Sequence, residues 1–419
     1  DRRIIGFLVG ASAPLAMVVF AAGLRLAIAY HIVAYAVALF ACCMCCNGEL
    51  VKIKPPPQYL TLFYLAISFG GVVGGVFVAF IAPYVFSDFS EYPLLLASCG
   101  ILTLVQWYRS RAWLPYIGKQ YWIIGPVAGM VLTIASAATL INSSTSVGKI
   151  LTSRNFYGVL RLTKERTGPN QILQLTHGRV IHGSQFLADE RRVWPTTYYG
   201  PRSGISLAMS HHPRRLDPFD TSVRVGVVGL GAGTAAIHAS EGDYIRFYEI
   251  NPAVISIANN YFSYLDHSSA TVDIIHGDAR IQMESELTRN NFQRFDILVV
   301  DAFSSDAIPI HLLTAECSSI YWRHLKPDGL LLFHISNETL NLAPVIHGLA
   351  DLSGATAFAI ISDGDHERGV SSATWFVVTK NQKFLADEFI KTELAKHAAS
   401  QLKPIVWTDG FASIWSVLK

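Results

Sequence analysis

The chain has 419 residues, of which 51% are hydrophobic and 15% are charged, and 33 basic residues nearly balance 31 acidic ones. An ordinary soluble domain is about 25% charged, so this composition excludes a disordered chain and disfavours a fully soluble one. The chain also lacks the basic excess with which nucleic-acid-binding proteins neutralise phosphates. Six cysteines are too few for a disulfide framework in a chain of this length.

Charged residues are distributed unevenly along the chain. Residues 1–146 hold twelve of them, whereas the other 273 residues hold 52. A polar run at 142–146 is suited to a linker. The sequence therefore predicts a membrane region over 1–146, followed by a domain of ordinary soluble composition.

Five apolar segments in the first 146 residues approach or exceed the roughly 20 residues that span a bilayer. They are residues 4–24, 26–46, 59–86, 93–108 and 121–141. Paired glycines at 70–71 and 74–75 recur at a spacing that lets helices approach closely. We therefore expect about five transmembrane helices, with an uncertainty of one.

Strands and helices alternate in the second half of the chain. Strands are expected over 223–228, 244–250, 271–276, 295–300 and 330–335, and helices over 235–240, 252–264 and 311–324. This alternation predicts a Rossmann-like, doubly wound α/β domain, which binds its ligand at the carboxyl ends of the strands. Short strand candidates within 155–215 predict a small antiparallel β element before it.

Polar residues follow the expected strands where a nucleotide would bind. The first strand ends in Gly229-Leu230-Gly231-Ala232-Gly233, whose glycines allow a tight turn and close approach to a ligand. Glu249 ends the second strand, where it can accept hydrogen bonds from both ribose hydroxyls or lie in solvent. Asp278 follows the third strand, where it can accept a bond from an adenine amino group or cap the next helix. A dinucleotide dehydrogenase would fit the first two motifs equally well.

Two further carboxylates, Asp301 and Asp306, follow the fourth strand on one loop. They place negative charge where a cationic substrate or a sulfonium group would lie, and a redox pair has no need of that charge. The alternative is that both are ordinary loop acids. The histidines at 177 and 182 lack a cysteine or carboxylate partner at ligand spacing, so no metal site is expected.

Over nearly its whole length the chain resembles the spermidine synthase family, in particular the membrane-fused spermidine synthase-like proteins. In the membrane half the resemblance rests on motifs at 63–65, 70–75, 82–83 and 91–93. In the second half it rests on motifs at 154–161, 177–178, 182–185, 195–199, 229–234, 249, 277–279, 301–309 and 407–409.

The resemblance implies a class I methyltransferase-type fold and transfer of an aminopropyl group from decarboxylated S-adenosylmethionine to an amine, releasing methylthioadenosine. It implies that Asp301 binds the attacking amine and accepts its proton, and that Tyr198 or Tyr199 orients that amine. Gln185 and Asp306 would contact the substrate. The residues implied to bind the donor are Gly229, Gly231, Ala232, Gly233, Glu249, Asp278 and Ala279.

Two residues depart from the pattern of soluble spermidine synthases. Ala232 replaces an aspartate of the glycine loop, and Gly200 replaces an acid that follows the tyrosine motif. Without the loop carboxylate, intact S-adenosylmethionine is not repelled, so a methyl- or aminocarboxypropyltransferase remains an alternative. A third alternative is a membrane sensor or transporter whose nucleotide domain binds without reacting.

These observations together predict a transmembrane region over 1–146, a linker and small β element over 147–215, and an S-adenosylmethionine-type catalytic domain over 216–419. The expected partners are a small-molecule amine and the lipid bilayer, not nucleic acid, and a homodimer is left open. The positive-inside rule places basic loops at 52–54 and 109–119 in the cytoplasm. Five spans would then put the catalytic domain outside, so either one span is miscounted or basic residues after 146 override the rule. We expect an integral inner-membrane protein of bacterial type with a cytoplasmic catalytic domain, because the donor is cytosolic.

Overall fold

The computed structural model describes residues 2–22, 28–109, 121–143, 148–178, 180–302, 309–337, 339–397 and 403–419. The chain divides into two compact units, Asp1–Val159 and Leu160–Lys419. The expected boundaries at 146 and 215 are not tested by this division and stay predictions. All the candidate site residues lie in the second unit.

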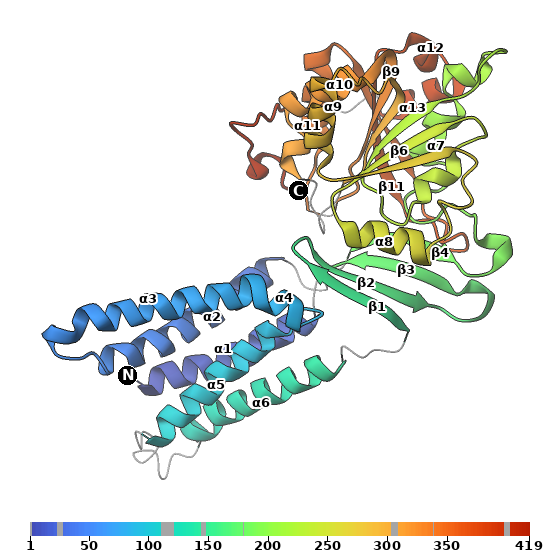
Figure 1. The fold of residues 1–419 in the computed structure, drawn as a ribbon. Helices are drawn as coiled ribbons and strands as arrows, with labels where there is room; N and C mark the ends of the chain where they lie inside the picture. Colours follow the sequence, from blue (N-terminus) through green and yellow to red (C-terminus); the bar gives the residue numbers. More distant parts are fainter. Residues whose placement is uncertain are drawn as a thin grey trace. The chain divides into compact units, whose positions relative to one another are not determined.

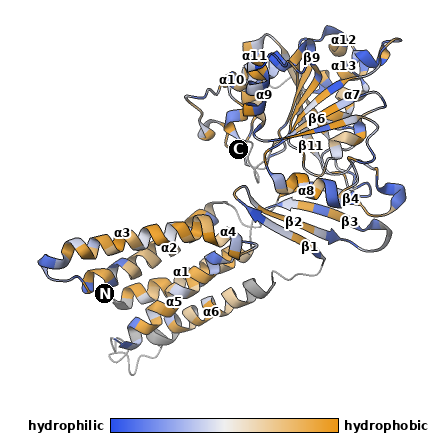
Figure 2. Ribbon diagram, in the orientation of Figure 1, coloured by the Kyte–Doolittle hydropathy of each residue, from blue (hydrophilic) through white to orange (hydrophobic). Residues whose placement is uncertain are grey.

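The first unit is built from apolar helices (Figures 1 and 2). They are α1 (Arg2–Ala22), α2 (Ile28–Lys52), α3 (Leu60–Val76), α4 (Ala82–Val85), α5 (Glu91–Arg109) and α6 (Tyr121–Ser143). A π-helical turn over Phe77–Ile81 joins α3 to α4. Three stretches, Ile4–Ala21, Ala29–Lys52 and Pro57–Val85, are long and apolar enough to cross a membrane, and two shorter ones cover Glu91–Gln106 and Pro126–Ala138. The helices thus correspond to the five expected segments, and their crossing of a membrane remains a proposal.

Close helix packing occurs at different glycines from those that the sequence suggested. A Cβ atom at Gly10 of α1 would lie 2.7 Å from the carbonyl oxygen of Pro126 on α6, so the two backbones are nearly in contact. The paired glycines of α3, from Gly70 to Gly75, have no described heavy atom within 4 Å of their Cβ positions. The close approach expected at α3 is therefore absent from the described part of the chain. The basic residues at 111 and 119, used for the topology argument, lie outside the described residues.

A buried ion pair joins the start of α5 to strand β1 (Lys149–Asn155) within the first unit. The Arg154 guanidinium donates to both Glu91 carboxylate oxygens, at 2.6 and 2.8 Å, and also to the Asp88 carbonyl oxygen. Its carbon lies 4.8 Å from the centroid of the Phe89 ring. Bidentate geometry of this kind fixes orientation as well as charge, so β1 is held rigidly against the loop before α5.

The β element that was expected before the nucleotide domain is present. Strands β2 (Gly158–Glu165), β3 (Ile172–His177) and β4 (Val180–Phe186) pair antiparallel in a sheet of order β1-β2-β3-β4. Leu162, Leu175 and Phe186 are fully buried on one side. This sheet brings β4 to the glycine loop, as described below.

The second sheet has seven strands in the order β10-β11-β9-β8-β5-β6-β7. The strands are β5 (Arg224–Val228), β6 (Tyr244–Glu249), β7 (Thr271–His276), β8 (Phe295–Val300), β9 (Leu325–His334), β10 (Thr356–Ser362) and β11 (Ala373–Thr379). Strands β5 to β9 are parallel, as expected, whereas β10 and β11 pair antiparallel and make the sheet mixed. The order reverses beside β5, between β6 and β8, and open α/β sheets bind ligands at such a switch point.

Helices cover this sheet (Figure 1). They are α7 (Gly204–Ser210), α8 (Pro252–Tyr261), α9 (Ala279–Thr288), α10 (Ala315–His324), α11 (Ala343–Ser353), α12 (Gln382–Leu385) and α13 (Glu388–His397). A core cluster joins α9, α10 and α11 to the sheet through side chains such as Met283, Ile320 and Leu349. Every residue of β8 is buried, as is typical of a parallel strand covered on both faces. The helix expected over 235–240 is instead a short 3₁₀ helix, Thr234–His238.

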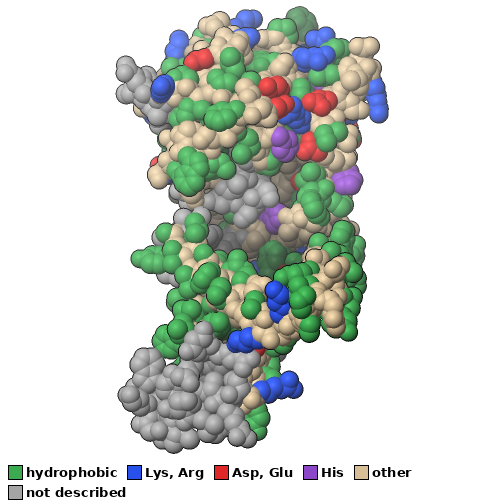
Figure 3. Space-filling model, turned by 90° about the vertical axis from the view of Figure 1, so that its left-hand side faces the viewer, with side chains coloured by type: hydrophobic (Ala, Val, Ile, Leu, Met, Phe, Trp, Pro, Cys, Tyr) green, Lys and Arg blue, Asp and Glu red, His purple; other side chains and the backbone are tan. Residues whose placement is uncertain are grey.

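The visible face of the second unit carries no single-sign patch. Acidic and basic side chains lie interspersed over its α/β part, together with histidines (Figure 3). This distribution agrees with the near-zero formal charge of +2.

Candidate active site at the carboxyl ends of the strands

The glycine loop after β5 adopts a conformation that requires its glycines. Gly229, Gly231 and Gly233 have φ angles of 100°, 55° and 82°, a region that side chains disfavour. A Cβ atom at Gly229 would also lie 2.3 Å from the Asp301 carbonyl oxygen, and one at Gly231 would lie 2.5 Å from that of His182. The loop is therefore pressed between β8 and β4, and only glycine fits at these positions.

Ala232 faces strand β4. It is 1% exposed, and a Cβ atom built on Gly183 would lie 2.4 Å from the Ala232 methyl carbon. The small side chain and the glycine therefore occupy the space together. An aspartate at position 232 would need room that β4 fills in this arrangement.

Glu249 lies at the end of β6 beside the glycine loop. It is 8% exposed, and its carboxylate accepts hydrogen bonds from the backbone amides of Leu230, at 3.0 Å, and Asn251, at 2.8 Å. Burial raises the pKa of Glu249, and these backbone donors act in the opposite direction. One oxygen bonds each amide, so each retains a lone pair with which a carboxylate can accept a further hydroxyl.

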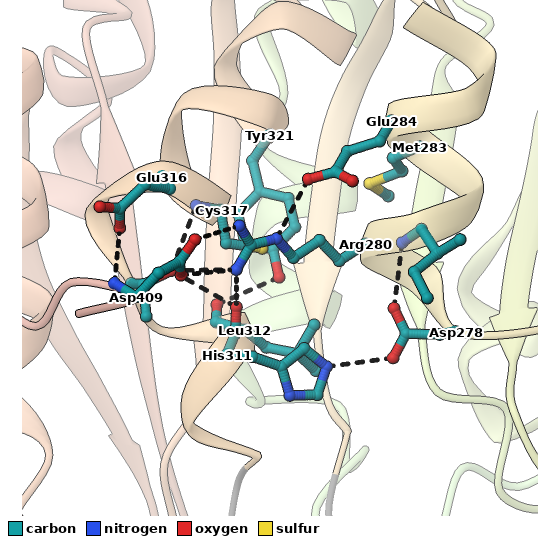
Figure 4. A network of polar contacts seen from close by, with 12 residues as sticks. Asp278, Arg280, Met283, Glu284, His311, Leu312, Glu316, Cys317, Tyr321 and Asp409 are labelled. Atoms are coloured by element: carbon teal, nitrogen blue, oxygen red, sulfur yellow. Dashed lines mark hydrogen bonds and ion pairs between the residues drawn. The ribbon is translucent and has the colours of Figure 1, made fainter. Parts of the chain in front are cut away.

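Asp278 caps helix α9, as one of the two sequence interpretations proposed. Its Oδ1 accepts the Ile281 amide at 3.0 Å, and its Oδ2 lies 3.0 Å from Nε2 of His311 (Figure 4). Ala279, the first residue of α9, is buried directly behind it. The contact of Asp278 with an adenine amino group stays a prediction.

A second ion pair beside Asp278 connects α9 to the C-terminal motif at 407–409. Two nitrogens of Arg280 donate to the Asp409 carboxylate at 2.7 and 2.5 Å, and one also donates to the His311 carbonyl at 3.1 Å (Figure 4). The Arg280 hydrogen bonds hold the pKa of Asp409 low, at about 2. The network fixes the backbone that carries His311, and thereby the partner of Asp278.

Asp301 is the buried carboxylate at the centre of the site. It is 9% exposed, follows β8 directly, and its amide donates to the Val228 carbonyl at 2.9 Å. The Tyr199 hydroxyl donates to Oδ2, and Nδ1 of His334 lies 2.8 Å from Oδ1. The carboxylate thus has a partner on each oxygen, and the adjacent glycine loop covers its backbone.

Both tyrosines of the motif at 195–199 reach Asp301. Burial, and then the charge of Asp301, raise the pKa of Tyr198 and of Tyr199 well above the ordinary value, so both hydroxyls stay protonated. Thr197 adopts a left-handed φ of 54°, and its amide donates to the Gly369 carbonyl at 2.8 Å. The turn that presents the tyrosines is therefore held by the chain between β10 and β11.

His334 belongs to this cluster, although the sequence analysis did not identify it. It ends β9, whose register pairs Phe333 with Val300 of β8, so the next residues, His334 and Asp301, are neighbours. Its ring stacks on Tyr198, with centroids 4.1 Å apart, and on Trp375 of β11, at 4.7 Å. A histidine that ends a run of apolar strand residues was the available signal.

A second histidine near the site, His182, lies on β4. Its ring centroid is 5.4 Å from that of His177, and its Nε2 is buried without a hydrogen-bond partner among the described residues. Burial, followed by the charge of His177, lowers the pKa of His182 to about 4, so it is neutral at physiological pH. No group of three or more histidine, cysteine or acidic side chains that could hold a metal occurs in the described ranges.

The expected substrate contacts fare differently. Gln185 is buried, and its amide nitrogen donates to the Arg192 carbonyl at 3.0 Å and to the Ser263 hydroxyl at 2.9 Å. Its oxygen accepts the Ser263 amide at 3.1 Å, so this side chain ties β4 to the chain after α8. A substrate contact of Gln185 stays a prediction, and Asp306 lies outside the described residues.

The position of Gly200 explains why it carries no acid. A Cβ atom there would lie 2.5 Å from a methyl group of Val370. An apolar side chain thus fills the space that an acidic residue would need.

Comparisons with known proteins agree with this site over part of the chain. No protein-family model matches. The chain is 31% identical over 112 residues to a polyamine aminopropyltransferase of Vibrio vulnificus, covering 26% of this chain and 36% of that protein. It is 28% identical over 113 residues to an N-terminal histidine N-methyltransferase of Emericella nidulans, covering 27% of this chain and 20% of that protein. The chain therefore spans about a third or less of the length of these relatives.

Similar solved structures include spermidine synthases. That of Thermotoga maritima is 14% identical with a TM-score of 0.38, covering 62% of this chain and 81% of that chain. A probable spermidine synthase of Corynebacterium glutamicum is also 14% identical, with a TM-score of 0.41, covering 64% of this chain and 98% of that chain. An O-methyltransferase from Bacillus cereus is 13% identical with a TM-score of 0.30, covering 42% of this chain and 78% of that chain. The curated aminopropyltransferase supports a spermidine synthase-like family for the part of the chain that it matches.

Proposed function

We propose that the second unit is an aminopropyltransferase that moves an aminopropyl group from decarboxylated S-adenosylmethionine to a small amine. The observation that carries this proposal is the buried Asp301 carboxylate, which lies beside the glycine loop and is contacted by Tyr199. A carboxylate there can hold an ammonium group and accept its proton. The matched polyamine aminopropyltransferase supports the same reaction class.

In this proposal the donor lies across the ends of β5, β6 and β7. The glycine loop lets the backbone approach the adenosyl group, and Glu249 accepts hydrogen bonds from the two ribose hydroxyls. The fit rests on a cradle that any Cβ atom at Gly229 or Gly231 would fill. Asp278, held by its cap and by His311, bounds the adenine side.

The acceptor amine lies against Asp301 in this proposal. It enters as an ammonium ion, which has no lone pair, so Asp301 must accept a proton before the nitrogen can attack. The nitrogen then bonds to the carbon next to the sulfonium, the carbon–sulfur bond breaks, and neutral methylthioadenosine leaves. The two tyrosine hydroxyls stay protonated because burial and Asp301 raise their pKa values, and they can orient the amine.

Calorimetric titration of the full-length protein in detergent tests the adenosyl part of the proposal. Methylthioadenosine and decarboxylated S-adenosylmethionine should bind, whereas NADH should not. Heat from NADH with none from the adenosyl ligands would reject the proposal in favour of a dehydrogenase.

A transferase that uses intact S-adenosylmethionine is the second candidate, and Ala232 favours it. No carboxylate at that position repels the carboxylate of the intact donor, and one relative is a methyltransferase. The products separate the two: S-adenosylhomocysteine marks methyl transfer, and methylthioadenosine marks transfer of the longer group. Methylthioadenosine from the intact donor would indicate aminocarboxypropyl transfer.

We also propose that the first unit anchors the enzyme in the inner membrane, with the second unit in the cytoplasm. Helix α3 supports the anchor, because it has no buried residue although it is strongly apolar. Extraction of cell membranes with alkaline carbonate tests the anchor, since an integral protein stays in the pellet. Protease digestion of sealed spheroplasts tests the side, since a cytoplasmic domain is protected until the membrane is opened.

A further inference from the structure

The contacts of Asp301 raise the question of where the amine proton goes after the first transfer. Both Asp301 oxygens already have partners, Tyr199 on one side and His334 on the other. A proton that stayed on the carboxylate would compete with these two hydrogen bonds, which favour the ionised form. The site therefore needs a second acceptor in contact with Asp301.

Resting on the proposed transferase function, we propose that His334 is this second acceptor, and that the proton taken from the amine by Asp301 comes to rest on its imidazole. His334 does not touch the amine in this scheme. It acts through Asp301 and is a positioning residue for the proton.

The first observation is the alignment of His334 between two polar partners. Its Nδ1 lies 2.8 Å from Asp301 Oδ1, and its Nε2 lies 2.8 Å from the Ser336 hydroxyl oxygen. The side chains of Asp301 and His334 are both only 4% exposed. The two ring nitrogens are thus hydrogen-bonded at opposite ends within a buried pair.

The second observation is the state of the Ser336 hydroxyl. Its oxygen accepts the backbone amide of Thr374 at 2.8 Å, and an amide nitrogen can only donate. A hydroxyl oxygen has two lone pairs, so it can also accept a hydrogen from Nε2 of His334. In that tautomer Nδ1 presents its lone pair to Asp301, ready to take a proton.

The third observation is the pair of aromatic rings that hold the imidazole. Tyr198 stacks on it at 4.1 Å with an interplanar angle of 24°, and Trp375 stacks on it at 4.7 Å with an angle of 27°. The indole nitrogen of Trp375 donates to the Tyr198 carbonyl at 3.2 Å, which ties the two stacking residues together. Such a stack prevents rotation of the ring, and aromatic faces attract a cation.

The proton balance of the step is complete. An N–H bond of the substrate ammonium breaks and an O–H bond forms on Asp301. That O–H bond then breaks as an N–H bond forms at Nδ1 of His334, which leaves an imidazolium between the Asp301 carboxylate and the Ser336 oxygen. The nitrogen of the amine attacks the donor while the carboxylate is again negative, and no further reactant is needed.

Chemical rescue of a truncated variant distinguishes proton acceptance from simple packing. His334→Ala leaves a gap between two aromatic rings, and its turnover should fall by about 10²-fold or more. Added imidazole should restore turnover at least tenfold, whereas pyrazole, a ring of the same size and far lower basicity, should not. His347→Ala is the matched control, because His347 on α11 packs edge-on against Phe376 and should be dispensable for turnover.

Two further readouts keep the test decisive. If His334→Ala fails to bind methylthioadenosine, His334→Gln replaces it, since its carboxamide fills space and bonds but does not accept a proton, and the same 10²-fold loss is expected. Ser336→Ala should lower turnover more than Ser336→Thr, which retains a hydroxyl.

Equal rescue by pyrazole, or unmodified turnover in His334→Gln, would overturn the inference alone. Absence of turnover in the unmodified protein, with methylthioadenosine bound, would instead overturn the proposed function together with it.

Discussion

Helix α3 and strand β8 are both almost entirely apolar, yet the protein treats them in opposite ways. None of the 17 residues of α3 is buried, whereas all six residues of β8 are. Burial of β8 between helices needs only water as the surrounding solvent. Exposed apolar side chains along all of α3 need a second solvent that does not penalise them, and a lipid bilayer supplies it.

The two units also differ in their polar groups. The second unit buries carboxylates at strand ends, as with Glu249 and Asp301, and each is met by directed hydrogen bonds. The described helices of the first unit bury small side chains, such as Ala13, Ala16 and Ala38. Buried charge costs several kcal/mol unless it is paired. Its retention in the second unit identifies that unit as the one that performs chemistry.

The largest expected effect comes from removing the base in the second unit. Asp301→Asn keeps the shape but cannot accept the proton, so turnover should fall by about 10²–10⁴-fold. Binding of methylthioadenosine should change little, because that product carries no amine. Steady-state kinetics and calorimetry on one preparation measure both, and full activity in Asp301→Asn would remove Asp301 from the mechanism.

A matched pair of leucines compares the two apolar elements directly. Leu298→Ala on β8 leaves a cavity and should destabilise the second unit by about 2–5 kcal/mol. Leu65→Ala on α3 should cost less than about 0.5 kcal/mol, because Leu65 is 64% exposed. Thermal unfolding in detergent measures both, and comparable losses would mean that α3 is packed against protein.

The pH dependence of stability should report His182. Its pKa is about 4 in the folded protein, against about 6.5 for an ordinary histidine, so the unfolded chain binds the proton more readily. Stability should be complete above pH 6.5 and fall as the pH drops toward 4, by at most about 3 kcal/mol for this group.

His182→Gln is the variant that isolates this contribution. It should flatten the slope between pH 6.5 and 4 in chemical unfolding curves. His238 remains as a second source of the same slope, since burial lowers its pKa to about 4 as well. An unchanged slope in His182→Gln would show that His182 is not neutral in the folded state.

Glu249→Gln should produce the smallest effect of the series. Replacing a charge-assisted bond weakens binding by about 1.5–3 kcal/mol, which is roughly 10- to 150-fold. Methylthioadenosine and both forms of the donor should weaken alike, because all three carry the ribose. A loss confined to one ligand would place Glu249 away from the ribose.

The sequence was sufficient to predict the strand ends but not their partners. Apolar runs that stop at Glu249 and Asp301 locate both carboxylates, because parallel strands end at one edge of the sheet. His334 could not be found in this way, since its contact with Asp301 depends on the register of β8 with β9. Trp375 depends in turn on the register of β11, whose antiparallel pairing with β9 is set by tertiary packing.

The roles of individual side chains were harder to predict than their places. Asp278 could have been an adenine contact or a helix cap, and its cap geometry is now evident, with His311 as an additional partner. Gln185 was expected at the substrate, and its hydrogen bonds instead join two parts of the scaffold. In both cases the polar group is satisfied by backbone that is distant in sequence, which a single sequence does not reveal.

The central claim is that the crevice beside Asp301 transfers an aminopropyl group, and product analysis tests it most directly. The full-length protein in detergent is incubated with decarboxylated S-adenosylmethionine and a set of small amines, and the products are identified by mass spectrometry. The account predicts methylthioadenosine and an aminopropylated amine in equal amounts, and neither product with Asp301→Asn beyond about 1% of that level. S-adenosylhomocysteine formed from the intact donor, with no aminopropylated amine from the decarboxylated one, would contradict it.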